Sequence, residues 1–179
     1  MLLMGVLAHW VAPYDPLTTN FAGMFARPGR THWFGSDAFG RDVLSRIIFG
    51  ARTALIVGFG SALLGATLGG ALGVTSAYFG GLTDLALQRL VDVLVSFPII
   101  VLAMAIVSII GAGIDKIVLA IALSFLPRAA LVVRSSALSV RSMAYIEAAR
   151  ALGGSHSRII LRHMAPNVVA PYLVMLTAF

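Results

Sequence analysis

The amino-acid sequence predicts an all-α membrane protein built as a bundle of transmembrane helices, and three observations lead to this fold class. Hydrophobic residues make up 59% of the 179 positions and charged residues only 11%, whereas a soluble domain averages about 45–50% and about 25%. Uncharged stretches long enough to cross a bilayer alternate with short polar segments. Cysteine is absent, so neither a disulfide framework nor a thiolate metal site is available.

The basic residues lie beside the apolar stretches. The net charge of +6 reflects twelve arginines and one lysine, Lys116. A positive balance of this kind can indicate contacts with nucleic-acid phosphates. Because these arginines flank apolar spans, they are instead typical of charge at a membrane interface.

Both ends of the chain are apolar but too short to cross a membrane. Residues 1–12 would form a helix of ~18 Å, against a hydrocarbon core of ~30 Å, and they lack the basic start of a signal peptide. We interpret them as the end of a first span, which Pro13 terminates, and residues 166–179 as the start of a fifth. We therefore expect a fragment of one membrane domain, with about three full spans between two partial ones.

Residues 13–52 are predicted to form a polar connection followed by a helix on the membrane surface. Ser36 is expected to cap this helix, and Asp37 and Arg41 form an acid-before-base pair at i,i+4 that favours it. One face is apolar and the opposite face is charged, which is typical of a helix that lies in the interface. A basic site for an acidic ligand is the alternative.

Residues 53–138 are predicted to contain the three full spans. The second span, within the uncharged stretch Thr53–Thr83, carries small residues four positions apart on one face, a pattern that lets another helix approach closely. These helix-packing residues are Ser61, Gly65, Gly69 and Gly73. The third span, Val93–Ile114, is uncharged for 22 residues and should kink at Pro98. The fourth begins at Ile117 and is interrupted by Pro127-Arg128.

The spans lack the side chains that several transporter and enzyme classes require. A proton- or sodium-coupled carrier normally needs buried carboxylates or histidines, and the second and third spans hold no ionisable residue. The sequence has neither a HExxH metal motif nor a phosphate-binding loop. Gly58-Phe59-Gly60-Ser61 faintly resembles a membrane serine-protease motif, but such clusters are common in helix packing. We expect no catalytic residue, no metal and no cofactor, so that any ATP would bind to another chain.

A polar segment at residues 139–165 follows the fourth span. Residues 143–152 are predicted to form an alanine-rich helix of ~15 Å, slim enough to enter a groove. Gly153-Gly154 should end it, and Ser155 can cap the next helix.

This segment resembles a known motif. Glu147-Ala148-Ala149, three residues, Gly153, twelve residues and Pro166 resemble the EAA loop of ABC-importer permeases. Further segments resemble the dipeptide/oligopeptide/nickel subgroup and its second permease type: His32-Trp33-Phe34-Gly35-Ser36-Asp37, Gly40-Arg41-Asp42-Val43-Leu44-Ser45-Arg46, Tyr78-Phe79-Gly80-Gly81 and Arg162-His163-Met164-Ala165-Pro166-Asn167.

The resemblance implies the type I ABC-importer permease fold and a multi-pass protein of a prokaryotic plasma membrane. Residues 13–52 would then be extracytoplasmic, and residues 139–165 would be a cytoplasmic loop that docks on separate ATPase subunits. The implied ATPase-coupling residues are Glu147, Ala148, Ala149, Arg150, Leu152, Gly153 and Pro166. The implied partners are a homologous permease, two ABC ATPases and an extracytoplasmic solute-binding protein. The solute would be a short peptide, nickel or a related molecule.

Three positions depart from the family pattern. Ala165 stands where the motif has leucine and His163 where it has isoleucine, while Leu131 stands where relatives often carry arginine. Arg128, three residues before Leu131, has two readings. It is either an arginine in a helix contact that extends toward the interface, or a pathway or gating residue that could hold a peptide carboxylate.

Two other functions remain open at this point. A secondary carrier would place its coupling carboxylates in spans outside this sequence. A truncated product would act as an assembly partner without transporting a solute.

Overall fold

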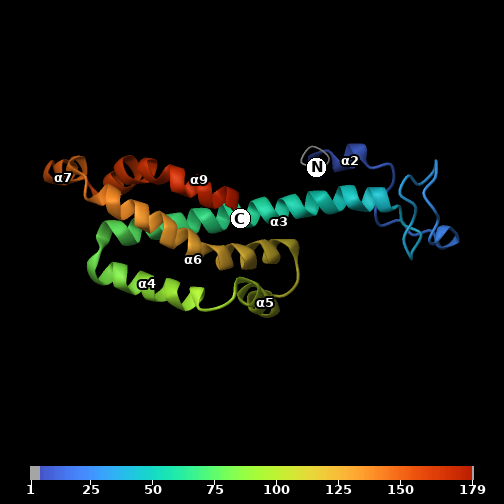
Figure 1. Ribbon diagram of the computed structural model, residues 1–179, viewed down its shortest axis with the longest axis horizontal. Helices are drawn as coiled ribbons and strands as arrows, with labels where there is room; N and C mark the ends of the chain where they lie inside the picture. Colours follow the sequence, from blue (N-terminus) through green and yellow to red (C-terminus); the bar gives the residue numbers. More distant parts are fainter. Residues whose placement is uncertain (1–4, 179) are drawn as a thin grey trace. The chain divides into compact units, whose positions relative to one another are not determined.

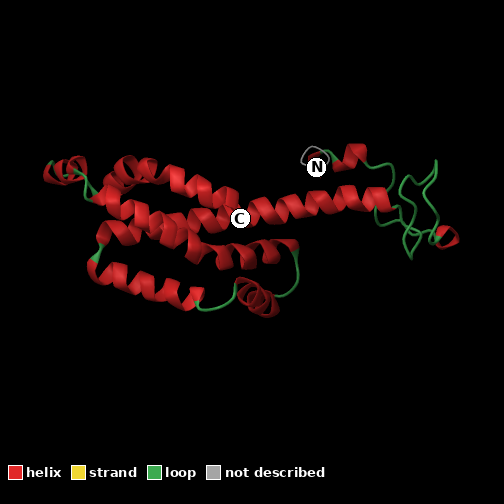
Figure 2. Ribbon diagram, viewed as in Figure 1, coloured by secondary structure: helices red, strands yellow, loops and turns green. Residues whose placement is uncertain are grey.

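The computed structural model describes residues 5–178, and these residues form helices and loops (Figures 1 and 2). Within them the only β-type pairing is an isolated bridge between Ser36 and Asp42, so the predicted all-α fold is confirmed. The chain divides into two compact units, one up to Val57 and one from Gly58 onward. The expected end of a first span falls partly on residues 1–4, which lie outside the described part.

The first unit contains α2 (Ala8–Val11), the short 3₁₀ helix η1 (Phe21–Gly23) and the beginning of α3 (Val43–Phe79). Asp42 caps α3, because its Oδ2 accepts hydrogen bonds of 2.8 Å from both the backbone N–H and the hydroxyl of Ser45. Its Oδ1 lies 2.9 Å from His32 Nδ1. The Asp42 side chain is buried, and both of its carboxylate oxygens have hydrogen-bond partners.

Asp37 organises the turn that precedes α3. Its carboxylate accepts backbone N–H bonds from Phe39 and Arg41 and pairs with the guanidinium groups of Arg41, at 2.8 Å, and Arg46. Although partial burial acts against ionisation, these donors hold the pKa of Asp37 at about 2, below its usual 3.8. The same reasoning applies to Asp42, whose pKa is also lowered by the Ser45 and His32 contacts.

The expected surface helix and second span are one continuous helix, which corrects the sequence interpretation. α3 begins at Val43, not at Ser36, and runs for 37 residues without a break near Thr53. Ser36 does not cap it; its hydroxyl instead donates to the Gly23 carbonyl and accepts from the backbone N–H of Ala26. No proline or helix-ending pair separates the two predicted segments, so nothing in the chain stops the helix.

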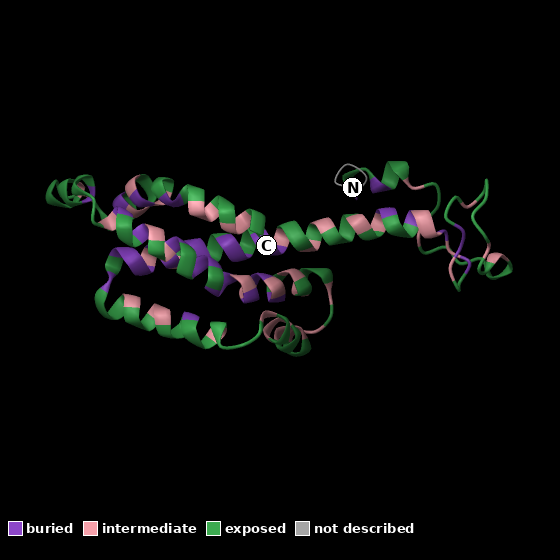
Figure 3. Ribbon diagram, in the orientation of Figure 1, coloured by how far each residue is buried: buried purple, intermediate pink, exposed green. Residues whose placement is uncertain are grey.

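The second unit is built around α6 (Ile114–Arg141), which packs against α4 (Gly81–Val95), α5 (Ile99–Ile110) and α9 (Val169–Ala178). Buried residues concentrate on α6 and on the second half of α3 (Figure 3).

Small residues bring α3 into direct contact with α6. A Cβ atom at Gly65 would lie 2.8 Å from the Ala122 carbonyl oxygen, and one at Gly73 would lie 2.6 Å from that of Ala130. At Gly69 it would overlap the Leu126 carbonyl. The Ser61 hydroxyl donates to the Val118 carbonyl at 3.2 Å. The four small residues thus lie along the line where the two backbones meet.

The third predicted span is broken where the sequence predicted a kink. α4 and α5 are bent by 93° across Ser96–Pro98. Proline has no N–H and disfavours helical backbone at the residue before it, so the helix ends there. Moreover, α4 starts at Gly81 and includes the residues expected to form a polar connection before Val93.

Among residues 5–178, three helices are long and apolar enough to cross a membrane, or four if the bent pair counts as one span. They are α3, α6 and the segment His156–Ala178, which is partly irregular. In this segment α8 (His156–Arg158) leads into a π-helical turn η2 (Ile159–Met164) and a 3₁₀ turn η3 (Ala165–Val168). Pro166 lies in that 3₁₀ turn, where the α-helical pattern cannot continue.

Candidate functional site

The segment after α6 forms a short helix with a well-defined end. α7 (Ala144–Ala151) stops in a left-handed turn: Gly153 has φ +75° and donates to the Arg150 carbonyl, while Gly154 donates to that of Ala149. This pair of bonds is a Schellman motif, which satisfies the last free carbonyls of a helix. Ser155 then caps α8 by accepting from the Arg158 N–H. The double glycine therefore turns the chain sharply after α7.

Buried apolar side chains fix α7 and η2 to the helical core. Ile146, Ile159 and Met164 are each at most 1% exposed and pack with Val133 and Val140 of α6. Three large apolar side chains buried in this way stabilise the segment by several kilocalories per mole, on the order of 1.5–3 each. α7 is thus packed against the ends of the core helices.

The outer surface of this segment carries a shallow cavity of about 340 Å³, called here the loop hollow. It is lined by Tyr145, Ala148, Ala149, Leu152, Gly154, Arg158, Ile159 and His163. Leu152 is 88% exposed there, and alanine side chains form part of the wall. An exposed leucine beside an apolar hollow is typical of a contact surface for another protein.

The loop hollow gathers three of the predicted coupling residues, Ala148, Ala149 and Leu152, but not all of them. Glu147 is exposed outside the hollow and makes no ion pair within residues 5–178. Pro166 is exposed in η3.

Arg150 is exposed and does not line the loop hollow. Its guanidinium carbon lies 4.8 Å from the centre of the Tyr78 ring at the end of α3. The Tyr78 hydroxyl makes a 2.8 Å hydrogen bond with His156 Nδ1, and Tyr78 itself is buried. These two contacts join the segments on both sides of Gly153 to α3. Sequence reasoning missed Tyr78 and His156 as partners, because nothing in the pattern links residues 78 positions apart.

A second polar contact that sequence reasoning missed joins three helices. Arg134 of α6 binds both carboxylate oxygens of Asp84 in α4, at 2.7 and 2.6 Å. Ser76 of α3 donates to the same carboxylate and accepts from Gln88. The sequence feature that could have indicated this contact is Arg134 itself, an arginine within the fourth span, six residues after Arg128, for which no partner was predicted.

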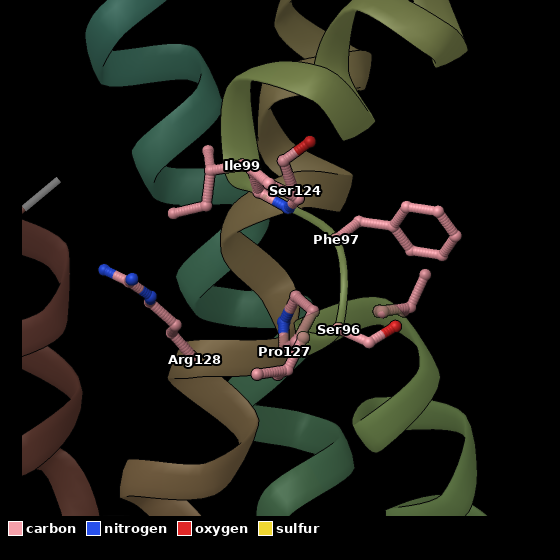
Figure 4. Close-up of a pocket in the computed structure, with 9 residues that line it drawn as sticks. Ser96, Phe97, Ile99, Ser124, Pro127 and Arg128 are labelled. Atoms are coloured by element: carbon pink, nitrogen blue, oxygen red, sulfur yellow. The ribbon is translucent and has the colours of Figure 1, made fainter.

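The break between α4 and α5 opens onto α6 near Arg128. A cavity of about 300 Å³ is lined by residues 94–99, Ser124, Pro127 and Arg128. Figure 4 shows the Arg128 and Ile99 side chains extending to one side of α6, with Phe97 on the other. Arg128 is exposed and has no hydrogen bond or ion pair to any residue that the structure describes. An unpaired cation halfway along an apolar helix is costly in a bilayer and typical of a functional position.

No group of three or more metal-ligating side chains occurs among the residues described.

The chain is similar to known membrane transport proteins. Residues 65–178 match the family model described as binding-protein-dependent transport system inner membrane component. The chain is 40% identical over 177 residues to a putative peptide transport system permease protein of Brucella suis, covering 99% of this chain and 60% of that protein. It is 36% identical over 178 residues to a glutathione transport system permease protein of Escherichia coli, covering 99% and 59%. The chain thus spans about 60% of the length of these relatives.

Proposed function

We propose that this chain takes part in peptide uptake, since it belongs to the family of binding-protein-dependent transport system inner membrane components. The family description and the three long apolar helices agree on a multi-pass protein of the inner membrane. The relatives named for peptide and glutathione transport support a short peptide as the solute.

The proposed role is that of the transmembrane subunit of an ATP-driven importer. The chain would form half of a translocation pathway with a homologous permease and receive solute from an extracytoplasmic binding protein. Two cytoplasmic ATPase subunits would supply the energy, as the resemblance of residues 147–166 to the EAA loop implies.

The observation that carries this proposal is the loop hollow on a firmly anchored α7. A partner that inserts an apolar side chain beside Leu152 would bury a leucine that is now 88% exposed. Because Ile146 and Ile159 are buried in the core, a displacement of α7 must also displace α6. Because Arg150 and His156 contact Tyr78 at the end of α3, a displacement of α7 would also displace α3. The fold can therefore transmit a movement of the ATPases to the spans.

Arg128 is the residue that we propose for the pathway itself. Its charge lies near the middle of α6, beside the cavity at the Pro98 break. A peptide carries a terminal carboxylate, which a guanidinium can bind through two parallel hydrogen bonds. Arg128 would then attract or gate the solute, and its unpaired state would be part of that role.

A substitution in the loop hollow tests the proposed coupling. Leu152→Asp places a charge in the apolar surface and should abolish ATP-dependent uptake of a radiolabelled dipeptide by cells that express the assembled importer, with membrane levels of the chain unchanged. Ser157→Asp adds the same charge at an exposed position outside the hollow, and should leave uptake within twofold of wild type. Normal uptake by the Leu152→Asp variant would remove the loop hollow from the mechanism.

A further inference from the structure

A second cavity lies beside the loop segment, around the contacts that Arg150 and His156 make with Tyr78. It measures about 390 Å³ and is called here the basic hollow. Its lining residues are Tyr78, Phe79, Arg141, Arg150, Gly154 and His156. Three of them carry nitrogen donors, two are aromatic, and none of these described residues is acidic. Asp84 interacts electrostatically with Arg141 but lies outside this lining and is paired with Arg134. The lining itself is therefore complementary to an anion.

The basic groups are held in place and keep free donors. Arg141 Nη1 donates to the Ala77 carbonyl at 3.0 Å, which leaves its other N–H groups available. Arg150 is stacked on the Tyr78 ring and makes no hydrogen bond or ion pair to the described residues. When the Tyr78 hydroxyl donates to Nδ1 of His156, the neutral imidazole carries its proton on Nε2, which is then a further donor.

Gly80 leaves room for the Arg141 side chain, which lines the basic hollow. It has φ +64°, which disfavours residues with a side chain, and a Cβ atom there would lie 2.5 Å from Nη1 of Arg141. The guanidinium of Arg141 therefore occupies space that only glycine leaves open. This arrangement places the Arg141 charge beside the turn between α3 and α4.

The basic hollow lies where membrane helices end. α3 ends at Phe79 and α6 at Arg141, and both helices are long and apolar enough to span a bilayer. Aromatic side chains at the ends of spans typically lie at the depth of the lipid headgroups. Leu82 and Leu85 of α4, which follow Phe79 closely in the chain, are 84% and 53% exposed.

We propose that the basic hollow binds the phosphate group of an anionic phospholipid. Guanidinium groups bind phosphate oxygens through paired hydrogen bonds, and basic pockets between transmembrane helices bind anionic headgroups. The acyl chains would lie along Leu82 and Leu85, which favours a lipid over free phosphate. A bound headgroup would bridge Arg141 at the end of α6 and Arg150 of α7, and would stiffen the junction between loop and span. This binding does not depend on which solute the chain moves.

Native mass spectrometry of the protein extracted from membranes tests the proposal. Phosphatidylglycerol and phosphatidylcholine with identical acyl chains serve as probes. Wild type should retain phosphatidylglycerol in preference to phosphatidylcholine, and Arg141→Gln/Arg150→Gln should lose most of that preference. The control Arg89→Gln/Arg162→Gln removes the same charge at two exposed positions outside the hollow and should keep it.

Two further arms make the result decisive. Since Arg141→Gln also removes the contact with Ala77, Arg150→Gln/His156→Gln provides a second variant that keeps it, and the same loss is expected. Millimolar inorganic phosphate should displace little phosphatidylglycerol if the acyl chains contribute. Equal retention of both lipids, unchanged binding by both hollow variants, or full displacement by inorganic phosphate would each overturn the proposal. Displacement of the lipid when the ATPase subunits assemble would assign the hollow to a protein partner instead. Peptide uptake is measured separately, so failure of lipid binding would leave the proposed transport function standing.

Discussion

At the scale of single residues, several charged side chains hold elements together through hydrogen bonds and ion pairs. Asp37 and Asp42 fix the turn before α3, and Asp84 and Arg134 join α4 to α6. Arg128 differs in its position, because it lies near the middle of the apolar helix α6 without a hydrogen-bond or ion-pair partner among residues 5–178. Sequence reasoning could single out Arg128 because its charge interrupts an apolar run. It could not pair Asp84 with Arg134, because that contact depends on how α4 folds back along α6.

The Asp37 carboxylate predicts a pH dependence for the first unit. Because its pKa is lowered from 3.8 to about 2, it stabilises the fold at neutral pH, and this stabilisation is lost as the pH falls from about 4 to about 2. Both tryptophans, Trp10 and Trp33, lie in this unit, so tryptophan fluorescence reports its unfolding. Asp37→Asn should lower the unfolding temperature at pH 7 and have little effect at pH 2. An equal effect at both values would show that the charge of Asp37 contributes nothing.

At the scale of elements, the apolar pattern predicted helices well and their boundaries less well. The stripe from Ser61 to Gly73 indicated close packing, and in the structure it faces α6. The charged positions between Asp37 and Arg52 suggested a separate surface helix, yet Asp37 to Asp42 lie in the turn before α3, and α3 runs without a break through Arg46 and Arg52. Pro98 indicated a bend in the third span, but the 93° angle depends on the packing of α5 against α6, which the sequence does not display.

Two glycines of α3 provide a matched test of the contact with α6. Gly69→Ala would place a methyl group against the Leu126 carbonyl and the Ala129 side chain, and should destabilise the fold by about 1–3 kcal/mol through overpacking. Gly58→Ala meets no atom within 4 Å and should stabilise the helix by up to about 1 kcal/mol. Thermal unfolding in detergent, followed by circular dichroism, compares the two. Equal shifts in the same direction would show that α3 does not need Gly69 for its contact with α6.

At the scale of the whole molecule, the second unit joins its spans to the surface that we propose binds a partner. Ile146, Ile159 and Met164 bind the loop segment to the core, and Tyr78 adds contacts to Arg150 and His156. The motif at residues 147–153 indicated where this surface would be. It did not show that the Arg150 guanidinium lies over the Tyr78 ring, because the position of a side chain on α7 depends on how α7 packs against the end of α3.

We propose that ATPase subunits cover the loop hollow. The chain contains no cysteine, so a single introduced cysteine can be labelled without background. Leu152→Cys should react rapidly with a fluorescent maleimide in the isolated chain and become protected when the ATPase subunits assemble with it, whereas Ser157→Cys should remain reactive in both states. Equal labelling of Leu152→Cys with and without the ATPases, in a complex shown to be assembled, would contradict the account.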